Sequence, residues 1–444
     1  MRIITELSNL SALCRPFGRF IFSFRQANRL LRSLLRKFSM PVTRRTLTEK
    51  QTAALLAALI ALMPLSIDAY LPAIPQLADY LQADIHLIEQ SLSSFMFGVA
   101  IGQLVGGSIS DVKGRRSVAL AGLALFVLSS LGLTLLQNVE QLLALRWIQA
   151  LGAGMAVVMV GAVVRDRYEG RQAAQMFALI GIILMMAPLV APMLGSVLQS
   201  IGGWRTIFGA LTFYGALILA LVYLFLPASG GSGGKIDRHF MSGVFQRYCN
   251  VVQTHRALGF LFLQAFSFGS MFCFLTESPF VYMKLYELNP TDYAWVFACN
   301  ILTMAAFNRI TAWRLKTGSN AEDILKWGVG LQLAANVLMV LLVLSFGLPP
   351  MWLLVLAVML SVGTQGLISA NTQACFMAHF RSDGGSANAL LMSGSSLIAA
   401  LMGWLTTMLH DGSVNVMAGM MLLSSLLGVS LLWGFSRKEL LPKR

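Results

Sequence analysis

Long stretches without charge constrain this chain more than any other feature of its sequence. Two apolar segments, Gln90–Ser110 and Ser117–Val139, contain no Asp, Glu, Lys or Arg and meet at the charged turn Gly107–Arg116. A helix of about 20 apolar residues is long enough to cross a bilayer. Only 12% of all residues are charged, whereas soluble proteins have roughly 25%. The chain is therefore predicted to be a membrane protein made of spanning helices.

The apolar segments and their breaks predict twelve spans in two sets of six. Trp327–Phe380, for example, has no charged residue and is broken only at Gly347–Pro350, which predicts a hairpin of two spans. The expected domains are a basic extension at 1–45, a six-helix bundle at 46–228, a cytoplasmic linker at 229–256, a second bundle at 257–436 and a cytoplasmic tail at 437–444. The linker contains the glycine-serine run Ser229–Gly234, which is expected to be flexible.

The basic residues predict how the spans are oriented. With the N-terminus inside, all of the 33 Lys and Arg except Arg146, Arg205 and Lys284 fall in cytoplasmic segments or the span ends beside them. The positive-inside rule then places both termini in the cytoplasm. The net charge of +14 does not predict a nucleic-acid partner, because the basic residues separate apolar runs instead of gathering in one domain.

Residues 1–45 fit this pattern poorly. They are rich in Lys and Arg, and Leu30, Leu34 and Phe38 recur at helical spacing beside the basic residues. One interpretation is an amphipathic helix on an anionic membrane surface, and another is an upstream start codon, with Met40 opening the functional protein. The segment lacks the long apolar core and small-residue cleavage site of a secretory signal.

The inventory of reactive residues does not indicate an enzyme, a cofactor or a metal. The sequence has no H-E-x-x-H motif, and its five cysteines are scattered without the spacing of a disulfide framework or a zinc site. Three ionisable residues, Asp68, Arg146 and Glu277, lie instead within apolar spans. Such groups mark an ion or substrate path by default. Transport is therefore favoured over the alternative, a non-transporting membrane scaffold.

The turn between the second and third predicted spans carries a family resemblance. Five of its residues match the pattern G-x-L-A-D-R-x-G-R-R of the major facilitator superfamily: Gly107, Asp111, Gly114, Arg115 and Arg116. Val112 stands where an Arg is usual. Gly107 and Gly114 are expected to let two helices meet closely and the chain reverse.

Further motifs resemble drug:proton antiporters of that superfamily. The fourth predicted span carries Arg146, Gln149, Gly152 and Gly154, and the fifth carries Pro188, Pro192 and Gly195, with Ala187 and Ala191 in place of frequent glycines. The segments Ile67–Pro75, Val164–Arg167 and Gly203–Phe208 are similar to the bicyclomycin/chloramphenicol-resistance (Bcr/CflA) family. The resemblance covers about residues 46–440.

The resemblance implies an all-α fold of two six-helix bundles, with a cavity between them. It also implies a multi-pass protein of the bacterial inner membrane that works as a monomer. Its partners would be protons, the lipid bilayer and drug-like molecules exported by alternating access. A proton-coupled importer of a small metabolite on the same fold is the alternative.

Several roles follow as expectations. Asp68 would carry the coupling proton with Arg146 as its ionic partner, and Glu277 would face the same cavity; the alternative is that Asp68 only caps a proline-broken helix. Asp111 would accept backbone N–H groups at a helix start, with Arg165 nearby, and latch the cytoplasmic side. The glycines and prolines of the fourth and fifth spans would pack or bend helices. The expected substrate cavity comprises Tyr70, Gln149, Gln365 and Asn371, although the last two could instead join helices.

Overall fold

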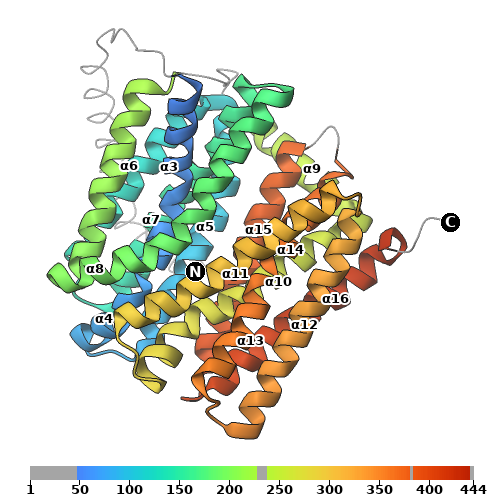
Figure 1. Cartoon of the computed structure of the whole chain (residues 1–444). Helices are drawn as coiled ribbons and strands as arrows, with labels where there is room; N and C mark the ends of the chain where they lie inside the picture. The colour runs from blue at the N-terminus through green and yellow to red at the C-terminus, as the bar shows by residue number, and fades with distance from the viewer. Residues whose placement is uncertain (1–47, 228–237, 381–383, 441–444) are drawn as a thin grey trace, which may run out of the picture. The chain divides into compact units, whose positions relative to one another are not determined.

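The computed structural model describes residues 48–227, 238–380 and 384–440, and within these ranges every regular element is a helix (Figure 1). The predicted extension at 1–45, the run Ser229–Gly234 and the end of the predicted tail lie outside the described residues. Residues 47–444 form one compact unit.

The first half of this unit forms one bundle of long helices (Figure 1). Its elements are α3 (Glu49–Asp68), η1 (Leu71–Ala73), α4 (Ile74–Leu81), α5 (Ile85–Lys113), α6 (Arg115–Thr134), α7 (Val139–Arg167) and α8 (Gly170–Phe225). Polar residues cap several of these helices. Thr48 and Gln51 form a reciprocal capping box on α3, and the Asp84 carboxylate accepts a hydrogen bond from the N–H of His86 at the start of α5. Such caps satisfy N–H groups that have no partner inside the helix.

The second half forms the other bundle. Its elements are α9 (Arg238–Gln253), α10 (His255–Pro279), η2 (Phe280–Leu285), α11 (Pro290–Lys316), α12 (Ala321–Phe346), α13 (Met351–Gly363), α14 (Gln365–Met377), α15 (Gly384–Met408) and α16 (Val414–Leu440). The predicted break at Gly347–Pro350 lies between α12 and α13. Helix α9 lies within the segment 229–256 that was expected to link the bundles. It forms because the segment has an apolar side, and Val251 on that side is buried in the second bundle.

Twelve helical crossings account for the predicted twelve spans. Ten helices of the described residues are long and apolar enough to cross a membrane. One of these, α8, is two helices merged across Gly202 and Gly203, where φ of Gly203 is +71°. The remaining crossing is α11, which spans 27 residues but carries basic side chains near its end. The prediction of an all-helical transmembrane fold is confirmed.

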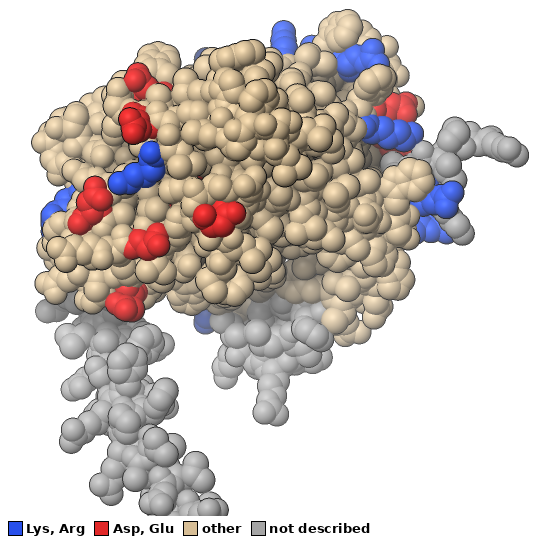
Figure 2. All heavy atoms as spheres, turned by 90° about the horizontal axis from the view of Figure 1, so that it is seen from below, with Lys and Arg blue, Asp and Glu red and all other residues tan. Residues whose placement is uncertain are grey.

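The two bundles share one hydrophobic core. Buried side chains of both halves, such as Phe95 of α5 and Phe272 of α10, belong to a single apolar cluster. The two bundles meet chiefly where α5 contacts α15 and where α8 contacts α11, and α5 also contacts α10. Viewed from below, most of the visible surface is uncharged and acidic side chains gather on one side of it (Figure 2).

Candidate functional site

Arg146 is the largest fully buried side chain of the described residues. Its Nη1 donates to the Ser66 carbonyl and to Gln149 Oε1, both at 2.9 Å. Gln149 Nε2 in turn donates to Ser130 Oγ at 2.8 Å. The guanidinium also lies over the rings of Tyr70 and Phe95, at 4.8 and 4.5 Å, where aromatic faces attract a cation. Arg146 of α7 therefore ties together α3, α5 and α6.

The expected ion pair between Asp68 and Arg146 is absent, and this prediction was wrong for the conformation seen here. Asp68 is the last residue of α3 and is buried, yet its carboxylate forms no hydrogen bond or ion pair with another described residue. The reason lies in the helix end. The last four carbonyls of a helix have no partner within it, and they form the negative end of its dipole. Ser66 supplies one of these carbonyls. Arg146 donates a hydrogen bond to it instead of pairing with the Asp68 carboxylate.

Arg146 is nevertheless only partly satisfied. Its Nε and Nη2 atoms are buried and have no hydrogen-bond partner among the described residues. An incompletely paired cation in an apolar interior is costly. The structure therefore leaves donors on Arg146 for a further acceptor.

Glu277, the third predicted ionisable residue, lies in a different cluster. Its Oε2 lies 3.0 Å from Nδ1 of His410, in the turn between α15 and α16. Across from it, His86 Nδ1 lies 2.8 Å from Oε2 of Glu89, both on α5. The two imidazole rings stack with centroids 3.3 Å apart and planes inclined by 29°. We call Glu89, His86, His410 and Glu277 the histidine array.

The histidine array joins the two bundles. Glu89 and His86 belong to the first bundle, whereas Glu277 and His410 belong to the second. Both carboxyl side chains are fully buried, and the two imidazoles are 13% and 7% exposed. Phe280 packs edge-on against both rings, with centroids at 4.9 and 4.6 Å. We call this end of the spans the histidine end and the end with the Gly107–Arg116 turn the loop end.

The sequence analysis identified Glu277 but not His86, Glu89 or His410. The second span was expected to begin at Gln90, but α5 begins at Ile85, so that His86 and Glu89 lie inside the helix. Their spacing of three residues on a span end is the local signal that could have drawn attention to them. His410 had no such signal, because its partners come from other helices.

Side-chain nitrogen and oxygen atoms of His86, Glu277 and His410 lie within 4.8 Å of one another, which is close enough for all three to bind one metal ion. An imidazole nitrogen binds a metal along a lone pair in the plane of its ring. The two rings are stacked, so their lone pairs run side by side instead of converging on one point. The geometry does not fit a shared metal ion.

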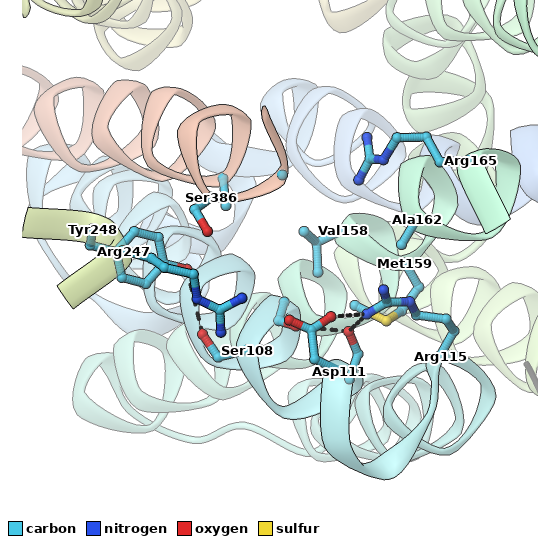
Figure 3. A pocket seen from close by; sticks show the side chains of 14 residues that line it. Ser108, Asp111, Arg115, Val158, Met159, Ala162, Arg165, Arg247, Tyr248 and Ser386 are labelled. Atoms are coloured by element: carbon cyan, nitrogen blue, oxygen red, sulfur yellow. Dashed lines mark hydrogen bonds and ion pairs between the residues drawn. The ribbon is translucent and has the colours of Figure 1, made fainter. Parts of the chain in front are cut away.

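At the loop end, the predicted turn surrounds a small cavity of about 240 Å³ (Figure 3). Gly114 has φ of +87° between α5 and α6, which confirms its role in reversing the chain. Arg115 contacts Asp111 at 2.5 Å and Asp166 at 3.1 Å. Arg116 donates to the Tyr223 carbonyl. The turn is thereby fixed to α7 and α8.

The environment of Asp111 differs from the expected one. Asp111 lies in the last turn of α5 and pairs with Arg115, not with backbone N–H groups at a helix start. Gly385 and Ser386, at the start of α15, line the same cavity, as does Arg165 (Figure 3). Asp111 and the start of α15 line this cavity without a hydrogen bond between them in the described part of the chain, whereas the Ser108 hydroxyl of α5 lies 3.4 Å from the Tyr248 hydroxyl of α9.

The motif glycines make close helix contacts. A Cβ atom on Gly195 would collide with the backbone of Ala69, one on Gly152 with the Gly122 carbonyl, and one on Gly154 with the Val99 carbonyl. Pro188 and Pro192 lie inside α8 with helical dihedral angles, and the non-helical dihedral angles of α8 occur at Gly202 and Gly203. Packing is thus the structural role of these glycines.

Gly107 was expected to permit a close helix approach, and this expectation was wrong. The nearest atom to a Cβ on Gly107 is 3.9 Å away, on Val158. The close approach of α5 to α7 occurs nearer the middle of α5, at Gly98, Gly102 and Gly106. The reason is that Gly107 lines the cavity at the loop end.

The four residues expected to line the substrate cavity are all buried and bonded in other ways. Tyr70 accepts a hydrogen bond from Ser91 at 3.3 Å, and Gln149 holds Arg146. Gln365 donates to Ser267 at 2.7 and 2.8 Å, and Asn371 donates to the Leu367 carbonyl of its own helix. None of them lines the cavity at the loop end. Their role in substrate binding stays a prediction.

The helical bundles and the buried ionisable residues between them define a polytopic membrane transporter. A match to a family model supports this assignment to the transporters. Residues 55–403 match the Major Facilitator Superfamily, and the chain belongs to this superfamily. It is therefore a transporter and not an enzyme.

Curated relatives include drug-resistance proteins. The chain is 29% identical over 349 residues to the "Bicyclomycin resistance protein homolog" of Haemophilus influenzae, covering 78% of this chain and 86% of that protein. It is 30% identical over 322 residues to the "Chloramphenicol resistance protein" of Pseudomonas aeruginosa, covering 70% of this chain and 74% of that protein.

Solved structures share the fold at low sequence identity. The human organic anion transporter MFSD10 superposes with a TM-score of 0.64 at 18% identity, covering 87% of this chain and 99% of that chain. The xylose transporter XylE of E. coli superposes with a TM-score of 0.66 at 13% identity, covering 86% of this chain and 97% of that chain. These likenesses establish the fold alone.

Proposed function

We propose that this protein is a proton-coupled multidrug efflux antiporter of a bacterial inner membrane. It exports drug-like molecules by alternating access, with the loop end and both termini in the cytoplasm. The observation that carries the proposal is the complete burial of Arg146 beside the helix end that bears Asp68. The drug-resistance names of the relatives support the substrate class.

A buried acid without a partner is suited to carry a proton. Asp68 is 6% exposed and unpaired among the described residues. Arg146, fixed on the Ser66 carbonyl two residues before Asp68, still has two free nitrogens. We propose that Asp68 is protonated in the conformation seen here and that, once deprotonated, it pairs with Arg146. Proton binding and release would thereby change how α3 and α7 are joined.

The two ends of the molecule support alternating access. At the histidine end the bundles are in direct contact through the stacked rings. At the loop end a cavity lies between α5, α7, α9 and α15, and the bundles meet beside it through the contact of Ser108 with Tyr248. This combination corresponds to a conformation closed at one end. In the proposed cycle, Asp111 latches onto the start of α15 when the loop end closes.

Transport in inverted membrane vesicles tests the proposal. In an efflux-deficient host, vesicles with an imposed pH gradient should accumulate chloramphenicol against its concentration gradient. Asp68→Asn should abolish gradient-driven accumulation while leaving downhill exchange. Uphill accumulation by this variant would exclude Asp68 as the proton carrier, and accumulation only in right-side-out vesicles would indicate an importer.

A further inference from the structure

The histidine array confines four ionisable groups to one apolar interface. His86 and His410 form the contact between the bundles, and each is backed by a buried glutamate of its own bundle. Three atoms have no hydrogen-bond partner among the described residues, namely Glu89 Oε1, Glu277 Oε1 and His410 Nε2. A proton on Glu89, Glu277 or His410 would place a donor at one of these atoms.

Neighbouring groups do not balance the charge of the array. Asp84 lies 3.9 Å from His86 Nε2 but is 65% exposed. Asp411 is also exposed, and its hydrogen bond from Ser413 lowers its pKa, so it remains a hydrated carboxylate. Lys284 pairs with Asp79, outside the array. Cys273, Tyr70 and Tyr293 are buried groups around the array, and Tyr293 also faces Asp68. Arg146 donates to Ser66 and Gln149 and forms no ion pair with either glutamate of the array in the described structure.

The number of protons in the closed array follows from its charge. Two carboxylates with two neutral imidazoles carry a net charge of −2, which two protons neutralise. One proton fewer leaves an uncompensated negative charge in an apolar site, and one more leaves a positive charge on the stacked rings. Either excess is strongly destabilising because buried charge must be balanced.

We propose that Glu89, His86, His410 and Glu277 form a two-proton site whose loading closes the histidine end of the transporter. Its place in the transport cycle rests on the proposed proton coupling, but the site itself does not. Two protons taken up from the outside would let the two halves of the array meet. Their loss would separate the bundles at this end.

The direction of the pH effect can be worked out from the open form. When the bundles separate, water hydrates the four groups. A hydrated carboxyl then loses its proton near about pH 4.3, and a hydrated imidazole near about pH 6.5. Above about pH 7 the open form has lost both protons that the closed form requires. Each proton changes the closed-to-open ratio about tenfold per pH unit, so the ratio should fall by up to about 100-fold per unit.

A distance measurement across the histidine end tests this proposal without substrate or gradient. Spin labels at Gln137→Cys and Leu348→Cys, in a background with the five native cysteines replaced by alanine, report on loops of opposite bundles. Double electron–electron resonance between pH 5.5 and 8.5 should show a short distance at acidic pH. A longer distance should replace it above about pH 7, where hydrated imidazoles are neutral.

Two double variants make the test specific. The double variant Glu89→Gln with Glu277→Gln replaces both carboxylates by neutral amides, so the array is uncharged without binding protons. The short distance should therefore persist at pH 8.5. Asp84→Asn with Asp411→Asn removes exposed acids beside the array and should leave the wild-type response unchanged. The proposal is overturned if the wild-type distance ignores pH or if the Gln variant still opens at alkaline pH. Asp68→Asn should lose coupled transport but keep the pH dependence of the distance between the spin labels. This outcome would distinguish the histidine array from Asp68, the proposed proton carrier.

Discussion

His86 and His410 stack face to face with ring centroids 3.3 Å apart, although one belongs to α5 and the other to the turn between α15 and α16. This contact exists only while the two bundles meet at the histidine end. The glutamate behind each ring is fully buried. This contact between the two halves of the transporter is therefore made by ionisable groups from both bundles.

Arg146 should not tolerate replacement by lysine. Arg146→Lys keeps the charge but cannot bond Ser66 and Gln149 together while lying flat against Tyr70 and Phe95. We expect a loss of about 2 kcal/mol from the charge-assisted bonds and a fall in transport. Thermal unfolding in detergent and vesicle transport measure both. Arg205→Lys, at an exposed arginine, is the matched control, and an unchanged Arg146→Lys protein would contradict the structural role.

Gly195 should not accept a larger side chain. The Cβ of Gly195→Val would collide with the backbone of Ala69, next to Asp68. Overpacking of this kind costs about 1–3 kcal/mol and should displace the end of α3, so both stability and proton-coupled transport should fall. The control is Gly209→Val, in the second of the two helices merged in α8, where no atom lies within 4 Å of the added Cβ. Equal behaviour of the two variants in thermal unfolding would refute the close-packing role.

Asp111→Asn should slow transport without weakening substrate binding. The proposed latch requires the Asp111 carboxylate only when the loop end closes, so the maximal rate should fall about tenfold, as for the loss of one charge-assisted hydrogen bond. Asp166→Asn removes the other carboxylate on Arg115 and is the control. Transport kinetics and equilibrium binding separate the two effects. Weaker binding with a normal rate for the bound substrate would rule out the latch.

Deletion of residues 1–39 should leave membrane insertion and drug resistance unchanged. The segment differs in composition from the twelve-span pattern, and translation from Met40 preserves every described helix. Membrane fractionation and a susceptibility panel in an efflux-deficient host provide the measurements. Loss of insertion in the truncated protein would show that the segment has a role in targeting.

Much of the fold was predictable because its causes are local. Uncharged segments long enough to cross a bilayer predicted the spans. Gly347–Pro350 predicted the break between α12 and α13. Gly114 was recognisable as a turn because few other residues adopt positive φ. Burial of Asp68, Arg146 and Glu277 also followed from their position within apolar spans.

The sequence by itself determined which groups are buried, because span length and hydrophobicity act over neighbouring residues. Only the tertiary structure decided what those groups contact. Arg146 bonds the Ser66 carbonyl because α3 ends at Asp68 and frees that oxygen, and a span pattern does not place a helix end to one residue. His86 meets His410 because helices of opposite bundles converge at one end. Such contacts depend on packing between distant segments, which leaves no periodic signal along the chain.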